Sequence, residues 1–223
     1  FLDGLLHPLA VQGVPAHIPD WAKTGVVQDP LALRNLVEEG IKGIHQSLES
    51  LETHRDWSNL SRRLGEVIAR FHSLDSARAE GLKAPIASLQ EAVDGRLLAW
   101  ATKHYADLPS LPAVKAPVMV HRIPHFLSMR RAAGENKIAL LVFDGLAVDQ
   151  WVQIRESLAK RAPGLGFEEN TCFAWLPTIT SVSRQAIFSG LRPREFASSI
   201  ETTSYEPAQW SRFWQNEGLK ANE

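Results

Sequence analysis

The chain has 223 residues, 44% of them hydrophobic and 22% charged, and its formal net charge at pH 7 is −1. This composition is typical of a soluble globular protein, and the length suffices for one large domain or two small ones. The net charge of −1 excludes a protein that binds nucleic acid over a broad, strongly positive surface. A local basic patch remains compatible with this charge.

Cysteine usage and hydropathy restrict where the protein is expected to work. Cys172 is the single cysteine, so no intramolecular disulfide can form, which fits a reducing compartment. No apolar run approaches the roughly 20 residues that a membrane helix needs, and the first residues do not resemble a signal peptide. We therefore predict a cytoplasmic protein with no membrane partner. Because the chain begins at Phe1, we also expect it to be a piece of a longer protein.

The first half of the sequence has the pattern of amphipathic helices. Apolar residues recur every three or four positions over residues 30–53, 57–74 and 85–107. Asp56 precedes the second of these segments and is a candidate N-cap. We therefore predict three helices in this half of the chain.

Three prolines, Pro109, Pro112 and Pro117, follow the third helical segment. Proline cannot continue a helix, so a cluster of prolines favours a linker. We place a domain boundary here and predict a helical domain over residues 1–116 and a second domain over residues 117–223.

The second half alternates between strand-like and helix-like segments. Residues 137–143 and 169–176 are short apolar runs that predict strands. Helical patterns stand around them, at residues 124–133, from Val148 to the Pro163-Gly164 pair, at 181–189 and at 207–217. This order of strands and helices predicts an α/β fold with a parallel sheet and right-handed crossovers.

Polar residues follow the first predicted strand and precede the helix at 181–189. Asp144 comes directly after the strand, at the carboxyl edge where open α/β sheets bind their ligands. Thr178, Thr180 and Ser181 stand at the start of the helix. Free backbone N–H groups and the positive end of the helix dipole make a helix start a good place for phosphate.

The same residues also have ordinary structural explanations. Asp144 can belong to a turn between a strand and a helix, and Thr180 and Ser181 can be helix caps. Asp149 is better explained as a partner of the helix dipole than as a ligand. Arg184 could reach a bound phosphate, but a solvated helix face is the simpler explanation.

Two histidines, His121 and His125, have the i, i+4 spacing of paired zinc ligands on a helix. No Glu follows His121, however, and Pro124 lies between the two. We therefore interpret both histidines as surface or structural residues.

Two motifs together resemble one protein family. Residues 142–151 read V-F-D-G-L-A-V-D-Q-W, and residues 177–193 read P-T-I-T-S-V-S-R-Q-A-I-F-S-G-L-R-P. This pair resembles the PglZ family of bacterial BREX (bacteriophage exclusion) anti-phage systems, which is part of the alkaline phosphatase superfamily. The F-W-Q-N-E-G-L at residues 213–219 is also similar to that family. The resemblance covers roughly residues 118–223.

The resemblance implies a phosphohydrolase or phosphodiesterase with two divalent metal ions, usually zinc, with manganese or magnesium as other options. Asp144 would bind one ion, and Thr180 would bind the same ion and attack phosphorus. Thr178 is the alternative nucleophile, because one chain does not fix the register. The chemistry is sound, since a metal lowers the pKa of a threonine hydroxyl and holds it in line.

The resemblance also implies further Asp and His ligands downstream, and the chain has no match for them. We therefore expect the 223 residues alone to be inactive and to hold no metal stably. The expected substrates are phosphate esters, including nucleic acid or nucleotides, and the expected partners are other BREX proteins. The alternative is a non-catalytic interaction module that docks other proteins of the defence system.

Overall fold

The computed structural model describes residues 9–11, 26–28, 30–112, 115–135 and 137–219. The chain forms two compact units. Residues up to Trp100 form the first unit together with residues 147–166, and residues 101–146 and 167–223 form the second. The chain therefore enters the first unit twice, and the part that returns contains helix α7 (Val148–Arg161). The predicted domain boundary near residue 116 stays a prediction.

The first unit is helical apart from one short pair of strands. Strands β1 (Leu9–Val11) and β2 (Val26–Gln28) pair in parallel. The helices are α2 (Pro30–Ser47), η1 (Leu48–Ser50), α3 (His54–His72), α4 (Ser76–Ala79), η2 (Glu80–Leu82), α5 (Lys83–His104) and α7 (Val148–Arg161). These helices confirm the predicted helical pattern. None of the helices in the described residues is both long and apolar enough to cross a membrane.

Helix α3 begins with a capping box. The Thr53 hydroxyl accepts a hydrogen bond from the Asp56 backbone N–H, and the Asp56 carboxylate accepts one from the Thr53 N–H at 2.7 Å. These hydrogen bonds lower the pKa of Asp56, the backbone hydrogen bond from Thr53 most of all. The prediction that Asp56 is the N-cap was wrong by three residues, because Thr53 takes that place and Asp56 supports it from the first turn.

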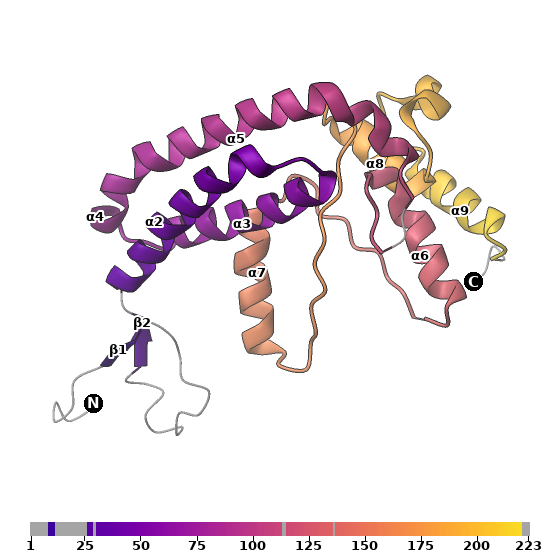
Figure 1. Cartoon of the computed structure of the whole chain (residues 1–223). Helices are drawn as coiled ribbons and strands as arrows, with labels where there is room; N and C mark the ends of the chain where they lie inside the picture. The colour runs from indigo at the N-terminus through magenta and orange to yellow at the C-terminus, as the bar shows by residue number, and fades with distance from the viewer. Residues whose placement is uncertain (1–8, 12–25, 29, 113–114, 136, 220–223) are drawn as a thin grey trace. The chain divides into compact units, whose positions relative to one another are not determined.

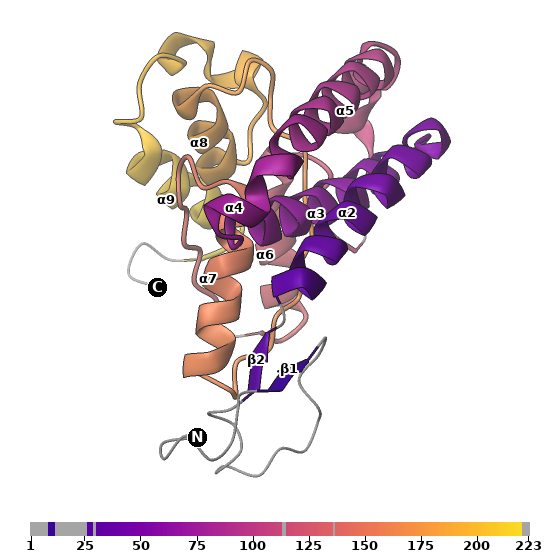
Figure 2. The same ribbon diagram turned by 90° about the vertical axis from the view of Figure 1, so that its left-hand side faces the viewer.

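Close contacts at two glycines join the helices of the first unit. A Cβ atom at Gly40 would lie 2.4 Å from a methyl carbon of Val67, so α2 approaches α3 closely there. A Cβ atom at Gly65 would lie 2.5 Å from a methyl carbon of Val148, which starts α7. Figures 1 and 2 both show α2 beside α3, and Figure 1 shows α7 meeting α3 from the side. The glycines therefore allow α3 to contact a helix on two of its faces.

The second unit contains shorter helices around a small core. They are η3 (Tyr105–Ser110), η4 (Val120–Arg122), α6 (Ile123–Ala132), α8 (Thr180–Ser189), η5 (Pro193–Ser199) and α9 (Glu206–Asn216). Val120, Ala186 and Phe196 form the buried centre. Figure 2 shows α8 and α9 side by side. The helices predicted from the sequence in this region are confirmed.

The predicted α/β fold is wrong, because the described residues of the second unit are helical and contain no parallel sheet. Residues 137–143 and 169–176 run without regular strand pairing, and one bridge joins Phe173 to Met119. A strand exists through hydrogen bonds to a neighbour, and residues 137–143 have no neighbouring strand within the described chain. Leu141 and Phe143 are consequently 69% and 68% exposed, although the pattern predicts burial.

Candidate functional site

The start of α8 has no capping side chain. Thr180 is the first helical residue, and the preceding Ile179 is the N-cap, with an extended backbone and no side-chain capping hydrogen bond. Neither Thr180 nor Ser181 therefore caps this helix, contrary to the simpler explanation from the sequence. The N–H groups of the first turn carry the positive end of the helix dipole and favour an anion.

Three hydroxyls lie at this helix start, and the structure separates their roles. The Ser181 hydroxyl donates a hydrogen bond to the backbone oxygen of Ile200 at 2.6 Å, so it holds the segment that follows η5. Thr178 and Thr180 are exposed, and within the described part of the chain neither hydroxyl has a hydrogen-bond partner. These two hydroxyls are thus the ones available to react.

Asp144 is exposed and ends the extended segment, and Gly145 follows it in a left-handed turn at φ +71°. The pKa of Arg184 on α8 is raised, chiefly by its hydrogen bonds to Glu206 and the charge of Glu206, and further by the charge of Asp144. Asp144 therefore lies close enough to α8 for its charge to act on Arg184. This electrostatic effect on Arg184 is the one link that the structure gives between Asp144 and the helix that carries Thr180.

Arg184 and Glu206 form a bidentate ion pair inside the second unit. The guanidinium Nε donates to Glu206 Oε1 at 2.9 Å, and Nη2 donates to Oε2 at 2.7 Å. Glu206 is 7% exposed, so Arg184 is the partner that compensates for the burial of this carboxylate. Sequence reasoning missed Glu206, because a Glu before Pro207 looks like an ordinary helix start.

The buried side-chain amide of Gln185 links α8 to neighbouring segments through hydrogen bonds. Gln185 is fully buried, and its Nε2 donates to the backbone oxygens of Ser199 and Ser181 at 2.8 and 3.2 Å. Its Oε1 accepts hydrogen bonds from the Ser199 hydroxyl and from Gln209 Nε2. Because two carbonyl groups fix the amide orientation, Gln185 ties α8 to η5 and α9. No local sequence pattern indicates this network.

Asp144, Thr178 and Thr180 offer the types of ligand atom that a metal ion binds, but they are too few to form a metal centre. A carboxylate at Asp144 and hydroxyls at Thr178 and Thr180 are oxygen donors that zinc, manganese or magnesium accept. Within the described residues, however, no group of three or more His, Cys, Asp or Glu is placed to hold an ion. These residues alone therefore do not make a two-metal centre.

The two histidines of the i, i+4 pair have separate structural places. His121 is 2% exposed and packs against the Trp175 ring, with the ring centroids 5.2 Å apart. His125 Nε2 lies 3.1 Å from the Gly190 backbone oxygen, and its ring meets Phe213 edge-on. The structural interpretation of both histidines is confirmed.

Burial controls the chemistry of two further residues in the second unit. It lowers the pKa of His121 to about 4, helped by the nearby charges of Arg122 and Arg192. It raises the pKa of the Cys172 thiol to about 11, and this side chain packs against the small core. Both groups are therefore uncharged at neutral pH.

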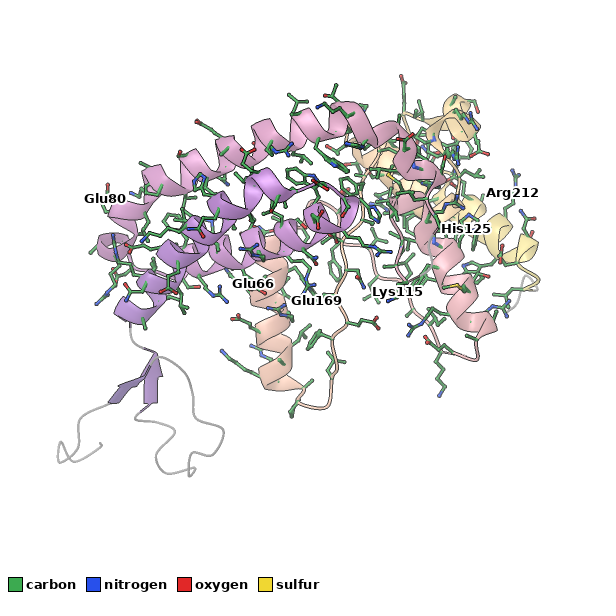
Figure 3. The ribbon with its side chains drawn as sticks, in the orientation of Figure 1. Glu66, Glu80, Lys115, His125, Glu169 and Arg212 are labelled. Atoms are coloured by element: carbon green, nitrogen blue, oxygen red, sulfur yellow. The ribbon has the colours of Figure 1, made fainter. Side chains whose placement is uncertain are left out.

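A separate cavity of about 620 Å³ lies along α9, next to η5 and the end of α8. Polar side chains that line it include His125, Tyr205, Gln209, Arg212 and Asn216. Figure 3 labels two of these lining residues, His125 on α6 and Arg212 on α9. Asp144, Thr178 and Thr180 do not line this cavity, so it is distinct from the open start of α8.

The part of the chain that carries Asp144 and Thr180 is similar to an alkaline phosphatase-like domain. Residues 128–223 match the family model described as the BREX system PglZ alkaline phosphatase-like domain. The resemblance to the PglZ family is confirmed over these residues, which include both motifs, Arg184 and Glu206. No curated protein matches the chain.

Proposed function

We propose that residues 128–223 contribute to a phosphoesterase that acts in BREX phage defence together with other BREX proteins. The observation that carries the proposal is the uncapped start of α8, with the exposed Thr180 hydroxyl on it and Asp144 within Coulombic reach of the same helix. The match to an alkaline phosphatase-like domain supports this chemistry. The expected substrates are phosphate esters, with nucleic acid and nucleotides as the classes to test first.

The backbone of α8 and the side chains of Thr180 and Asp144 have different roles in the proposed phosphoryl transfer. Backbone N–H groups of the first turn of α8 orient the phosphoryl oxygens. The Thr180 hydroxyl gives its proton to water as its oxygen bonds to phosphorus, the bond from phosphorus to the ester oxygen breaks, and the leaving oxygen takes up a proton from water. Water then releases phosphate and restores the hydroxyl. A bound pair of divalent ions, zinc in the first place, would supply charge stabilisation, with Asp144 and Thr180 each offering one ligand.

The test is hydrolysis of p-nitrophenyl phosphate and bis(p-nitrophenyl) phosphate by the full-length protein with Zn²⁺, Mn²⁺, Mg²⁺ or a chelator. We expect activity that the chelator removes. Asp144→Asn should lower that activity by about 100-fold or more, because an amide is a weaker ligand than a carboxylate. Asp149→Asn, on α7, is the matched control and should retain activity. Full activity of Asp144→Asn would refute the assignment of Asp144.

A second candidate function, an interaction module, rests on exposed apolar side chains. Leu141, Phe143 and Leu176 are 69%, 68% and 62% exposed, and Ile179 is 52% exposed. The first two belong to a segment that has backbone groups without a neighbouring strand in the described chain. Such a segment can accept an added strand from another protein. The proposed occupant is a protein of the same defence system.

This exposed segment predicts self-association of the 223-residue chain when no partner is present. Replacing Leu141 and Phe143 together by lysine should shift the sedimentation distribution toward monomer, because charges oppose edge-to-edge pairing. Leu98→Lys is the control, since Leu98 is 70% exposed on helix α5. A wild-type chain that sediments as a monomer at high concentration would contradict the prediction.

A further inference from the structure

We infer that Arg184 binds the phosphoryl group of the substrate and that the buried Glu206 positions Arg184 for this role. The inference rests on the proposed function and adds two residues to it. Arg184 would contact the substrate directly, whereas Glu206 would act through Arg184.

The position of Arg184 on α8 places it beside the candidate nucleophile. Arg184 follows Thr180 by four residues, so both lie on one face of the helix. Side chains of a helix lean toward its N-terminus, which directs Arg184 along the turn that holds Thr180. The charge of Asp144 also acts on Arg184, so this carboxylate lies within Coulombic reach of the guanidinium.

The ion pair with Glu206 leaves Arg184 with donors to spare. A guanidinium has five N–H donors, and Glu206 uses one on Nε and one on Nη2. The remaining N–H groups of Nη1 and Nη2 can donate to phosphoryl oxygens, for which the flat guanidinium is well suited. The Arg184 side chain is 35% exposed, so solvent and a ligand can reach it.

Glu206 fixes the direction of the guanidinium. It lies at the start of α9 and is 7% exposed, and its two oxygens hold Nε and Nη2 in a fork. A fork of two hydrogen bonds restricts a long side chain to one orientation. The Gln185 amide, next to Arg184 in the sequence, keeps α8 and α9 together and so maintains the fork.

The experiment measures binding of inorganic phosphate to the metal-free 223-residue chain, in chelator and low salt, by ³¹P NMR titration. Arg184→Gln should weaken phosphate binding by about tenfold or more, as expected for the loss of charged hydrogen bonds. Arg184→Lys keeps the charge without the fork and should bind with intermediate affinity. Arg212→Gln is the matched control. Figure 3 shows Arg212 on α9, where it is exposed, and this variant should bind phosphate like the wild type.

The positioning role of Glu206 is tested by measuring phosphate binding of Glu206 variants. The measurements use conditions in which the unfolding curve of each variant shows that it is fully folded. Glu206→Ala should weaken phosphate binding, and Glu206→Gln, which keeps one acceptor oxygen, should restore part of it. If Arg184→Gln does not fold because it leaves Glu206 buried and unpaired, the double variant Arg184→Gln/Glu206→Gln replaces the ion pair by two amides. The double variant should fold and show the same loss of phosphate binding.

The outcomes separate this inference from the proposed function. Unchanged phosphate affinity in Arg184→Gln or in the double variant would overturn the role of Arg184 and leave the proposed phosphoesterase intact. Unchanged affinity in Glu206→Ala would overturn the positioning role of Glu206. A wild-type chain that binds no phosphate at all would overturn the inference and also remove the anion site on which the proposed function rests.

Discussion

Replacing Thr180 by alanine should reduce hydrolysis of phosphate esters by the full-length protein by a factor on the order of 10³ to 10⁶, the range found when an enzyme loses its nucleophile. Alanine removes the oxygen that is proposed to bond to phosphorus. The backbone N–H groups of α8 remain, so phosphate binding should change little. Steady-state kinetics should therefore show a loss in kcat with a small change in KM.

Two neighbouring hydroxyls are the controls for this variant. Thr178→Ala removes the other exposed hydroxyl and should retain most activity, and the reverse result would transfer the role of nucleophile to Thr178. Ser181→Ala removes the hydrogen bond to Ile200 and should lower stability more than kcat. Full metal-dependent activity in Thr180→Ala would refute the assignment of Thr180.

The protein should lose stability between about pH 6.5 and pH 4 because of His121. Burial and the charges of Arg122 and Arg192 lower the pKa of His121 to about 4 in the folded state, against 6.5 for an exposed histidine. The unfolded chain therefore binds the proton more readily in this window, and proton binding favours unfolding. The difference in pKa corresponds to about 3 kcal/mol, present in full above pH 6.5 and lost as the pH falls to 4.

The contribution of His121 is measured by comparison with His121→Leu. Neither ring nitrogen of His121 has a hydrogen-bond partner within the described residues, so leucine should fit without loss of a hydrogen bond. His125 and Glu195, whose charges act on His121, are present in both proteins. Urea unfolding at several pH values should show a free energy that falls by about 3 kcal/mol more in the wild type. Parallel pH profiles of the two proteins would contradict the prediction.

The local pattern of apolar residues was enough to predict the helices, but it led to a wrong prediction of a sheet. The apolar repeat predicted α3 and α5, and the helix predicted at residues 207–217 agrees with α9 to within one residue at each end. A helix makes its hydrogen bonds within its own segment, so periodicity reveals it. A strand depends on a distant neighbour, and the apolar run at residues 137–143 has none in the described chain. Hydrophobic residues alone therefore predicted a strand that the structure does not contain.

The residues of the candidate site also fall into two groups, those that a local motif predicts and those that only the fold reveals. Asp144 and Thr180 stand in contiguous motifs that resemble a family, and the family match over residues 128–223 covers both. Their chemical roles stay predictions. Glu206 and Gln185 act through partners about twenty residues away, in α9 and η5. No local pattern marks such partners, so the groups that support the site became visible only in the fold.

The return of the chain to the first unit has a consequence for the order of folding. Gly65 of α3 lies against Val148 of α7, and the intervening residues 101–146 belong to the second unit. During synthesis, the face of α3 that contacts α7 stays uncovered until α7 emerges, and Val148 follows Gly65 by 83 residues, because 148 − 65 = 83. A chaperone that shields apolar surfaces on nascent chains would find that face of α3 open throughout this interval.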